Sequence, residues 1–373
     1  MTNAKHTSVR TPFVRLAKRS SIGAVRAWCI RVVAVLLALV INALLIYTIT
    51  KMNPLQVYVS MFKGAFGSTR RIWNFIREGC MLLCISVALA PAFKMRFWNI
   101  GAEGQVLAGG IATAACMIYL GGKLPTPVLF LVMVLASVAA GALWGFIPAL
   151  FKAKWGTNET LFTLMMNYIA IQITSYCVAL WENPYGSNKV GIINPQTKAG
   201  WFPKLFGQQY TWNVLIVLAL TVLVFLYLKY SKQGYEIAVV GESENTARYA
   251  GINVRHVILR TMLISGAVCG IAGFIGVAGV DHTISTNTAG GRGFTAIIIA
   301  WLAKFNTITM VIITSLIVFL NQGAGQIVSD FSKLGINDYV AEIIKGIILF
   351  FILGSEFFVN YRLIFRGSTK TNG

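Results

Sequence analysis

The stretch A-F-K-M-R-F-W-N-I-G-A-E-G-Q, from Ala92 to Gln105, decides the fold of this chain. Apolar runs of membrane-spanning length flank it, yet it contains charged side chains and two glycines, Gly101 and Gly104. Polar, glycine-broken backbone at membrane depth is tolerated only where protein or water satisfies its N–H and C=O groups. The stretch therefore predicts a break between two membrane helices beside a cavity or passage. The alternative interpretation is an ordinary basic loop joining two helices.

A second stretch of this character, G-V-D-H-T-I-S-T-N-T-A-G-G-R-G-F-T, runs from Gly279 to Thr295 in the other half of the chain. Interruptions at corresponding places in two halves point to a transport site between inverted structural repeats. The pair of stretches therefore favours a membrane transport protein.

Composition places the chain among multi-pass membrane proteins. Of its 373 residues, 56% are hydrophobic and 12% are charged, which is too apolar for a soluble domain of this length. The formal net charge of +20 does not indicate nucleic-acid binding, because the basic residues fall mostly at and beyond the ends of apolar runs, as membrane topology requires. The six cysteines form no closely spaced pair typical of a metal or redox site. We expect no metal, cofactor or nucleic-acid partner.

The apolar runs predict an all-α fold with about ten membrane spans, several of them broken or re-entrant. Their charged ends mostly agree with two cytoplasmic termini. The basic residues of the segment 51–78 would lie outside and so disagree with this topology. Either this segment is a short amphipathic or re-entrant piece, or the bounds of the first two spans are wrong. The run 292–303 is too short to cross the membrane unless the helix is tilted or the bilayer is locally thinner. The spans are expected near 32–50, 79–93, 104–120, 127–151, 160–180, 212–230, 258–280, 292–303, 306–322 and 340–358.

The predicted organisation is a basic cytoplasmic arm at 1–31, a transmembrane domain at 32–360 and a cytoplasmic tail at 361–373. A proline-containing outer loop covers 181–211, with Trp201 and Phe202 expected at the membrane interface. An inner loop at 231–257 contains a predicted short helix that begins at Ser243 and ends at Gly251 with Asn253. This short helix could dock on a partner protein. The alternative is that it has no partner, because many loops of membrane proteins contain a short helix.

The run 160–180 carries its polar residues on one helical face. This face either lines a passage or forms hydrogen bonds between helices. Just before it, Asn158 is a predicted N-cap, with Glu159 placed favourably for the helix dipole. The residues of the face are Thr160, Thr163, Asn167 and Thr174.

Five segments resemble the signature segments of permease subunits from bacterial ABC importers. The likeness extends from about Met81 to Glu356 and fits the branch that imports simple sugars and nucleosides, a family of the branched-chain amino acid and ribose type. The segments are F-W-N-I-G-A-E-G-Q at 97–105, G-T-N-E-T-L-F-T-L-M-M-N-Y-I-A at 156–170, A-R-Y-A-G-I-N-V at 247–254, S-G-A-V-C-G-I-A-G at 265–273 and G-R-G-F-T-A-I at 291–297.

The resemblance implies an inverted-repeat, type II-like permease in the bacterial cytoplasmic (inner) membrane. It implies as partners a second permease, identical or different, an ABC ATPase and an external substrate-binding protein. The residues that it places along the substrate pathway are Asn99, Glu103, Gln105, Thr163, Asn167, Arg292, Phe294 and Thr295. The residues that it places in the helix coupled to the ATPase are Glu242, Ala247, Arg248, Tyr249, Ala250 and Gly251.

The chain departs from the family pattern at three positions. The family commonly has an acidic residue at Thr295, a glycine near Lys304 and an uncharged polar residue near Lys345, which leaves the solute open. Lys345 lies one turn from Glu342, and this spacing predicts a structural ion pair.

No G-x-x-x-x-G-K-[ST] phosphate loop occurs, so we expect a partner subunit to hydrolyse ATP. An ion-coupled secondary transporter is the main alternative, with Glu103 and Asp281 as the candidate ion-binding carboxylates. An intramembrane enzyme is less well supported, because His282 and Ser285 have no obvious orienting partner and no H-E-x-x-H or G-x-S-G motif occurs.

Overall fold

Each of the ten apolar runs contains or forms a helix in the structure, a computed structural model that describes residues 14–19, 23–51, 53–205, 207–332 and 337–365. Among these residues, eight helices are long and apolar enough to cross a membrane, which confirms a polytopic helical fold. The eight do not include α11 or α13. The ten helices are α1 (Ala24–Thr50), α3 (Thr69–Lys94), α4 (Ala102–Leu120), α5 (Thr126–Trp155), α6 (Glu159–Leu180), α7 (Thr211–Tyr230), α10 (Val254–Phe274), α11 (Arg292–Leu302), α12 (Thr307–Phe331) and α13 (Asp338–Asn360).

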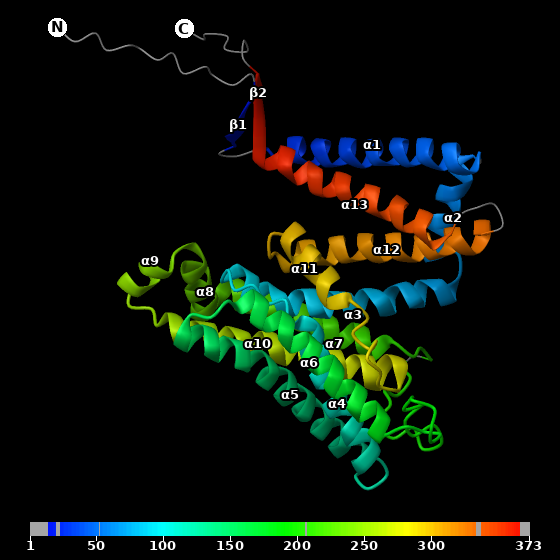
Figure 1. Cartoon of the computed structure of the whole chain (residues 1–373), viewed down its shortest axis with the longest axis vertical. Coiled ribbons are helices and arrows are strands. Elements are labelled where there is room, and N and C mark those ends of the chain that lie inside the picture. The colour runs from blue at the N-terminus through cyan, green and yellow to red at the C-terminus, as the bar shows by residue number, and fades with distance from the viewer. Residues whose placement is uncertain (1–13, 20–22, 52, 206, 333–336, 366–373) are drawn as a thin grey trace. The chain divides into compact units, whose positions relative to one another are not determined.

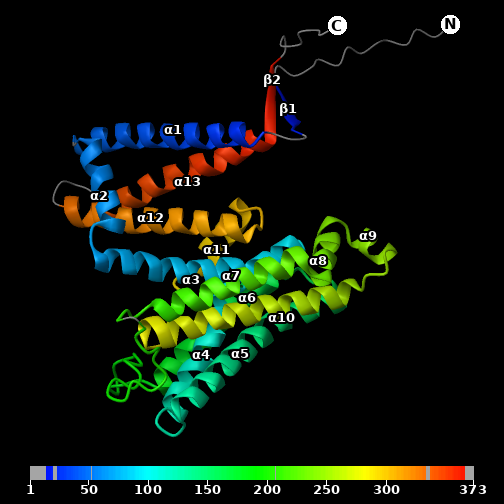
Figure 2. The ribbon, with the colours of Figure 1, turned by 180° about the vertical axis from the view of Figure 1, so that it is seen from behind.

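The chain forms two compact units, one of residues 65–319 and one that joins 1–64 to 320–373. In the unit 65–319, α4, α5, α6 and α10 lie side by side in both ribbon views (Figures 1 and 2). The run Ser265 to Gly273 explains their close approach, because a Cβ on Gly266 or Gly270 would overlap carbonyl oxygens of α5. Small residues of this kind let membrane helices pack backbone against backbone.

A π-helical turn, η1 (Ile275–Asp281), continues α10 and ends at His282, which has a left-handed backbone. Such turns are rare and frequently mark functional sites within helices. The predicted second break therefore begins with a distorted helix end.

In the other unit, α1 and α13 pack along each other. Arg31 Nε donates to Glu356 Oε1 at 2.8 Å, and Asn42 Nδ2 donates to the Ile344 carbonyl at 3.1 Å. A short antiparallel sheet joins β1 (Val14–Lys18) to β2 (Tyr361–Phe365). The sequence did not predict this sheet, and α1 begins within the segment predicted as the basic arm.

The segment 51–78 contains both features that the sequence left as alternatives. Helix α2 (Pro54–Phe66) is short and amphipathic, with Val57, Ser60, Met61 and Gly64 buried on one face. Helix α3 starts at Thr69 rather than near 79, because its first turns carry charged residues that hid them from a hydropathy pattern. The predicted start of the second span was therefore wrong.

Candidate functional site

The predicted break lies between the end of α3 and the start of α4, within the unit 65–319. Arg96 adopts a left-handed backbone with φ 60°, and the chain from Phe97 to Ile100 is non-helical. The Phe97 N–H still donates to the Ala92 carbonyl at 3.0 Å, so the turn is held by the end of α3. The sequence therefore identified a real interruption of the helical backbone.

The side-chain amides of Asn99 and Gln105 form hydrogen bonds to each other and to neighbouring groups within this break. Asn99 Oδ1 accepts from the Gly101 N–H at 3.0 Å and from Gln105 Nε2 at 3.2 Å, while Asn99 Nδ2 donates to Gln105 Oε1 and to Ser265 Oγ at 3.3 Å each. Asn99 is 0% exposed and Gln105 is 1% exposed. These side chains satisfy the broken backbone and tie it to α10.

The inward polar face of α6 bonds to the same break. Thr163 Oγ1 accepts from the Ile100 N–H at 3.2 Å, and Asn167 accepts from the Gly104 N–H at 2.8 Å and donates to the Ile100 carbonyl at 2.9 Å. Thr163 and Asn167 are buried. Their described contacts favour hydrogen bonding between helices, one of the two interpretations left open by the sequence, and contact with a solute stays a prediction.

At the start of α6, Asn158 is the predicted N-cap and accepts from the Leu161 N–H at 3.2 Å. The helix dipole alone does not account for Glu159, because this carboxylate pairs with Lys152 of α5 at 2.8 Å. The ion pair spans the turn between α5 and α6.

Glu103 joins the two interrupted stretches. Its Oε1 accepts from the Gly291 N–H at 2.6 Å and its Oε2 accepts from the Gly293 N–H at 2.8 Å, at the N-terminus of α11. A carboxylate there satisfies N–H groups that have no partner within the helix and interacts favourably with the helix dipole. A Cβ on Gly293 would lie 2.6 Å from Glu103 Oε2, so the close approach requires glycine.

Arg292 lies beside the contact between Glu103 and the first turn of α11, which we call the junction. It pairs with a residue that the sequence did not single out. Its Nη2 is 2.8 Å from Glu78 Oε2, and its Nη1 donates to the Thr288 carbonyl at 3.2 Å. Glu78 also pairs with Arg77 at 3.0 Å. The available signal for Glu78 was a lone carboxylate among basic residues, just before the apolar run that starts near residue 79, but the segment 51–78 had no settled interpretation.

The predicted pathway residues thus separate into two groups. Asn99, Glu103, Gln105, Thr163 and Asn167 are buried, whereas Phe294 is 47% exposed and Arg292 and Thr295 are partly exposed.

Phe294 begins an exposed stripe on α11 that continues through Ile298 and Trp301, which are 40% and 46% exposed. Trp98, from the α3–α4 break, stacks on Trp301 with ring centroids 5.0 Å apart and is 42% exposed. We call Trp98, Phe294, Ile298 and Trp301 the aromatic stripe. The spacing of Phe294, Ile298 and Trp301 is helical and was available in the sequence.

The predicted coupling loop contains two helices, α8 (Lys232–Glu242) and α9 (Glu244–Tyr249). Ser243 caps α9 as predicted, accepting from the Thr246 N–H at 3.3 Å. Gly251 ends α9 with φ 77°, but Asn253 caps α10 rather than ending α9, accepting from the His256 N–H at 3.2 Å. The loop therefore contains two short helices where the sequence predicted one.

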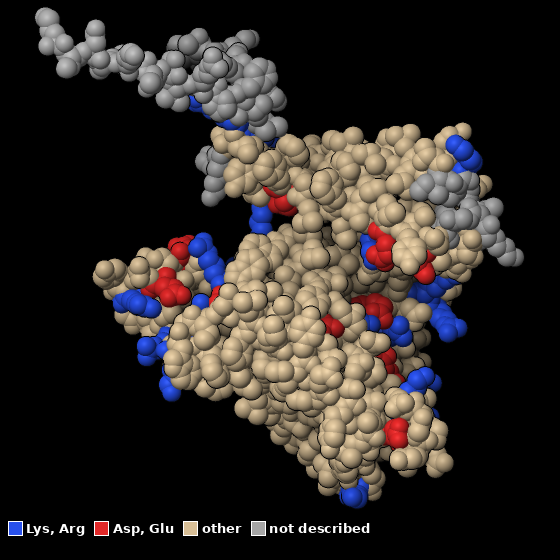
Figure 3. All heavy atoms as spheres, in the orientation of Figure 1, with Lys and Arg blue, Asp and Glu red and all other residues tan. Residues whose placement is uncertain are grey.

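The exposed face of α9 is not the small-residue face that the sequence suggested. Ala247 is fully buried, whereas Tyr249 is 94% exposed and Glu242, Arg248 and Ala250 are also exposed. Charged atoms gather over α8 and α9, in contrast to the mostly uncharged helix faces beside them (Figure 3). A partner would meet polar and aromatic side chains there.

Helix α8 sits directly on the α3–α4 break. A Cβ on Gly241 would overlap the Lys94 carbonyl oxygen, and Arg260 of α10 pairs with Glu236 of α8 at 2.9 Å. A cavity of about 170 Å³ between them is lined by Arg96 and Glu242, among others. The end of α3 therefore contacts α8 directly, as well as through α10.

The loop 181–211 packs onto the end of α10. The Ile193 N–H donates to the His282 carbonyl at 2.8 Å, and the Phe202 N–H donates to the Ala278 carbonyl at 3.1 Å. The Trp201 ring stacks on the His282 ring, with centroids 3.8 Å apart. Both rings pack against protein and stay partly exposed, so the position of Trp201 and Phe202 at the membrane interface stays a prediction.

His282 and Ser285 do not form a nucleophile and base pair in the described structure. His282 Nε2 lies 3.4 Å from Gln209 Nε2, and the Ser285 N–H donates to Thr288 Oγ1. The Lys345–Glu342 ion pair is confirmed, with Nζ 2.6 Å from Oε2.

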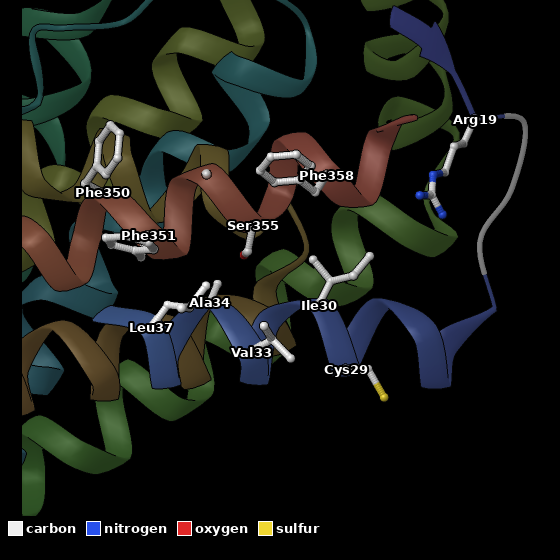
Figure 4. A pocket seen from close by; sticks show the side chains of 11 residues that line it. Arg19, Cys29, Ile30, Val33, Ala34, Leu37, Phe350, Phe351, Ser355 and Phe358 are labelled. Atoms are coloured by element: carbon white, nitrogen blue, oxygen red, sulfur yellow. The ribbon is translucent and has the colours of Figure 1, made fainter. Parts of the chain in front are cut away.

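A cavity of about 550 Å³ lies in the other unit, between α1 and α13 (Figure 4). Apolar side chains such as Leu37 and Phe351 line it, with Arg19 beyond the start of α1. It contains none of the predicted pathway residues, so it does not mark the passage that the two interrupted stretches predicted.

Residues 71–353 match the family described as the permease component of branched-chain amino acid transport systems. The chain belongs to this family. It is 29% identical to the guanosine ABC transporter permease protein NupP of Bacillus subtilis, over 87% of this chain and 92% of the relative. It is 27% identical to the glucose ABC transporter permease protein TsgB13 of Haloferax volcanii (94% and 93% covered) and to the nucleoside ABC transporter permease protein NupB of Lactococcus lactis (80% and 84%).

The family assignment confirms the resemblance found in five short segments and identifies the chain as an ABC transporter permease. Four of the five segments that carry the resemblance meet around Asn99 and Glu103: the α3–α4 break, the start of α6, the small-residue run of α10 and the start of α11. The fifth, 247–254, runs from α9 to the start of α10.

Proposed function

We propose that this permease forms the membrane passage of an ATP-driven importer for a nucleoside or a simple sugar. Both kinds of solute occur among the similar permeases, whose names include guanosine, nucleoside and glucose transporters. The partners would be a second permease, an ABC ATPase and an external binding protein, in a bacterial cytoplasmic membrane with both termini in the cytoplasm. ATP would be hydrolysed by the ATPase and not by this chain.

The proposed coupling to ATP hydrolysis rests on one observation: α8 packs directly against the end of α3, at the α3–α4 break. The ATPase would hold the exposed face of α9, and its closure would move α8 against the end of α3 at Gly241. Because Glu103 links that break to the first turn of α11, the push would reach α11 through hydrogen-bonded contacts. This route is shorter than one that follows α10 to the second interrupted stretch.

We propose that the solute passes along the aromatic stripe and not between the buried amides. Ribose and glucose rings have apolar faces and nucleobases have π-faces, and both pack on exposed aromatic side chains. Arg292 and Thr295 lie next to the stripe on α11 and are partly exposed, so they could bond to solute hydroxyl groups. The buried group would hold the passage in shape.

The deciding experiment measures uptake of radiolabelled guanosine and glucose in vesicles that contain the permease with its ATPase and binding protein. We expect uptake to stop without ATP and to survive collapse of the proton and sodium gradients. Uptake that follows an ion gradient without ATP would support the ion-coupled alternative and overturn the proposal. Glu103 does not favour that alternative, since backbone N–H groups already bind both of its carboxylate oxygens.

A proline at Ala250 is a weak probe of coupling, because Ala250 lies just outside α9. Ala250 follows the last residue of α9 and has φ −79°, which proline accepts, so the substitution removes one hydrogen bond, to the Thr246 carbonyl at 3.0 Å. Substitution of the exposed Tyr249 tests the same contact without disturbing the backbone.

A further inference from the structure

Four polar side chains lie on the exposed face of α6, opposite the buried face that bonds to the α3–α4 break. Tyr168 and Tyr176 are 59% and 69% exposed, and Gln172 and Ser175 are exposed as well. At about 100° per residue, the four fall within an arc of about 100° and so form one row along the helix. We call these four residues the exposed polar row.

The row lies at the depth where lipid tolerates polar groups least. Gln172 is about 4 Å from the middle of α6, at a rise of about 1.5 Å per residue. None of the four side chains forms a hydrogen bond within the part of the chain that the structure describes. Polar side chains in membrane helices face the bundle or a water-filled cavity, because hydrocarbon cannot bond to them. The row is therefore not expected to face lipid.

Two other helices of the chain have exposed sides that do suit lipid. Every exposed side chain between residues 131 and 147 on α5, and between 215 and 226 on α7, is apolar. The polar groups on α6 therefore do not reflect a general tolerance of such groups on the surface of the membrane helices.

The shape of the row favours a small ligand over a neighbouring helix. Membrane helices that pack closely meet at small residues, as α10 meets α5 at Gly266 and Gly270. On α6, Tyr168 and Tyr176 instead border a hollow of about 420 Å³ that Gln172 also lines. Small-molecule sites have volumes of about 300–1,000 Å³ and combine apolar walls with a few polar groups.

The chemistry of the row suits a neutral ring that carries hydroxyl groups. The Gln172 amide and the three hydroxyl groups can each donate and accept hydrogen bonds. The tyrosine rings can pack on the apolar face of a sugar ring. No charged residue occurs between 160 and 180, so a charged solute would lose its hydration there without gaining a counter-charge.

We propose that the exposed polar row binds the sugar ring of a neutral nucleoside or simple sugar and discriminates against its phosphorylated form. The assignment rests on the proposed import function, within which the row is a second solute contact besides the aromatic stripe. Helix α6 and that stripe meet at the α3–α4 break, where Thr163 Oγ1 donates to the Trp98 carbonyl at 3.3 Å.

Labelling of Gln172→Cys with a charged methanethiosulfonate tests the row without requiring transport. The reaction needs a thiolate, which forms in water and not in hydrocarbon, so we expect labelling above the wild-type level in membranes open to both sides. Millimolar guanosine or glucose should slow it by about twofold or more, whereas guanosine monophosphate and glucose 6-phosphate should not. Leu218→Cys, on the apolar exposed side of α7, should remain at the wild-type level.

Two results of the labelling would overturn the proposal. Labelling of Gln172→Cys no faster than wild type would place the row against lipid or a second permease. Labelling that neither guanosine nor glucose slows, or that the phosphorylated compounds slow equally, would show a wetted surface without the proposed selectivity.

Uptake in the reconstituted importer gives a second, independent measurement. Gln172→Leu keeps the approximate volume and removes the amide, so kcat/KM for uptake should fall about 2- to 10-fold with the unfolding temperature unchanged. Gln56→Leu makes the same change at an exposed position of α2 and should retain the wild-type kcat/KM. A wild-type value in Gln172→Leu would contradict the proposal. Absence of ATP-dependent uptake in the wild type would instead contradict the import function, and the labelling would still decide whether the row binds the solute.

Discussion

Two carboxylates of this permease make the same bonds in opposite surroundings. Glu103 accepts from the Gly291 and Gly293 N–H groups at 2.6 and 2.8 Å, and Glu182 accepts from the Gly186 and Asn188 N–H groups at 3.0 and 3.2 Å. Glu103 is 7% exposed, whereas the bonds of Glu182 lie in an exposed loop.

Water can replace the carboxylate in the exposed loop but not at the buried junction. The number of hydrogen bonds therefore says little about the importance of either residue. The same contrast separates the buried amides of the junction, which hold the backbone, from the exposed stripe and α9, which are free to contact a solute or a partner.

The largest effect is expected from Glu103→Ala. It leaves two backbone N–H groups without a partner at about 1–3 kcal/mol each, so α11 should detach from α4 and uptake should be lost. Thermal unfolding in detergent and vesicle uptake measure the two consequences. Glu182→Ala is the matched control, with an expected change of about 0.5 kcal/mol or less. If Glu103→Ala and Glu182→Ala lost similar amounts of stability and uptake, burial would not explain the importance of Glu103.

The next effect concerns the exposed face of α9. Tyr249→Ala removes a 94% exposed ring, and aromatic side chains at the centre of interfaces contribute about 2 kcal/mol or more to binding, or roughly 30-fold in affinity. We expect loss of ATPase co-purification with the unfolding temperature unchanged. Tyr185→Ala, which removes a 96% exposed ring from the loop 181–211, should retain the ATPase. Co-purification of Tyr249→Ala at the wild-type level would contradict the coupling assignment.

A smaller effect is expected on the aromatic stripe. Trp301→Ala removes one exposed ring of a stacked pair, and an aromatic contact contributes about 0.5–1.5 kcal/mol, so KM for uptake should rise about 2- to 10-fold with little change in stability. Leu218→Ala removes a side chain that is 60% exposed on α7 and should leave KM unchanged. An unchanged KM in Trp301→Ala would assign the stripe to contact with lipid or a partner permease.

These contrasts also show what the sequence could predict. Polar residues and glycines within apolar runs located both interrupted stretches, because such residues are costly in lipid unless the fold satisfies them. The pairing of Glu103 with Gly291 and Gly293 could not be predicted, since it joins residues 188 and 190 positions apart. Glu78 was missed for a related reason, because its partner Arg292 is 214 positions away.

Burial was the other quantity that the sequence could not supply. A helix as short as α9 has too few residues for a periodic pattern to show which side faces outward, and Ala247 was placed on the wrong side. The stripe on α11 did have a helical period, but its exposure depends on which neighbouring helices cover it. The resemblance to ABC permeases marked the functional segments without separating residues that hold the backbone from those that face outward.

The smallest effect is expected from pH, at the contact between His282 and the loop 181–211. Burial against Trp201 lowers the pKa of the His282 imidazole from its usual value of 6.5, so the packed loop favours the neutral ring. The state with the loop detached then binds more protons, and packing should weaken as pH falls below about 7, whereas at higher pH both states are neutral. Hydrogen exchange at the Ile193 and Phe202 amides, corrected for its intrinsic pH dependence, measures this opening. In His282→Gln the extra opening at low pH should disappear, while the adjacent Asp281 titrates in both proteins. The same pH dependence with and without the imidazole would place the titrating group elsewhere.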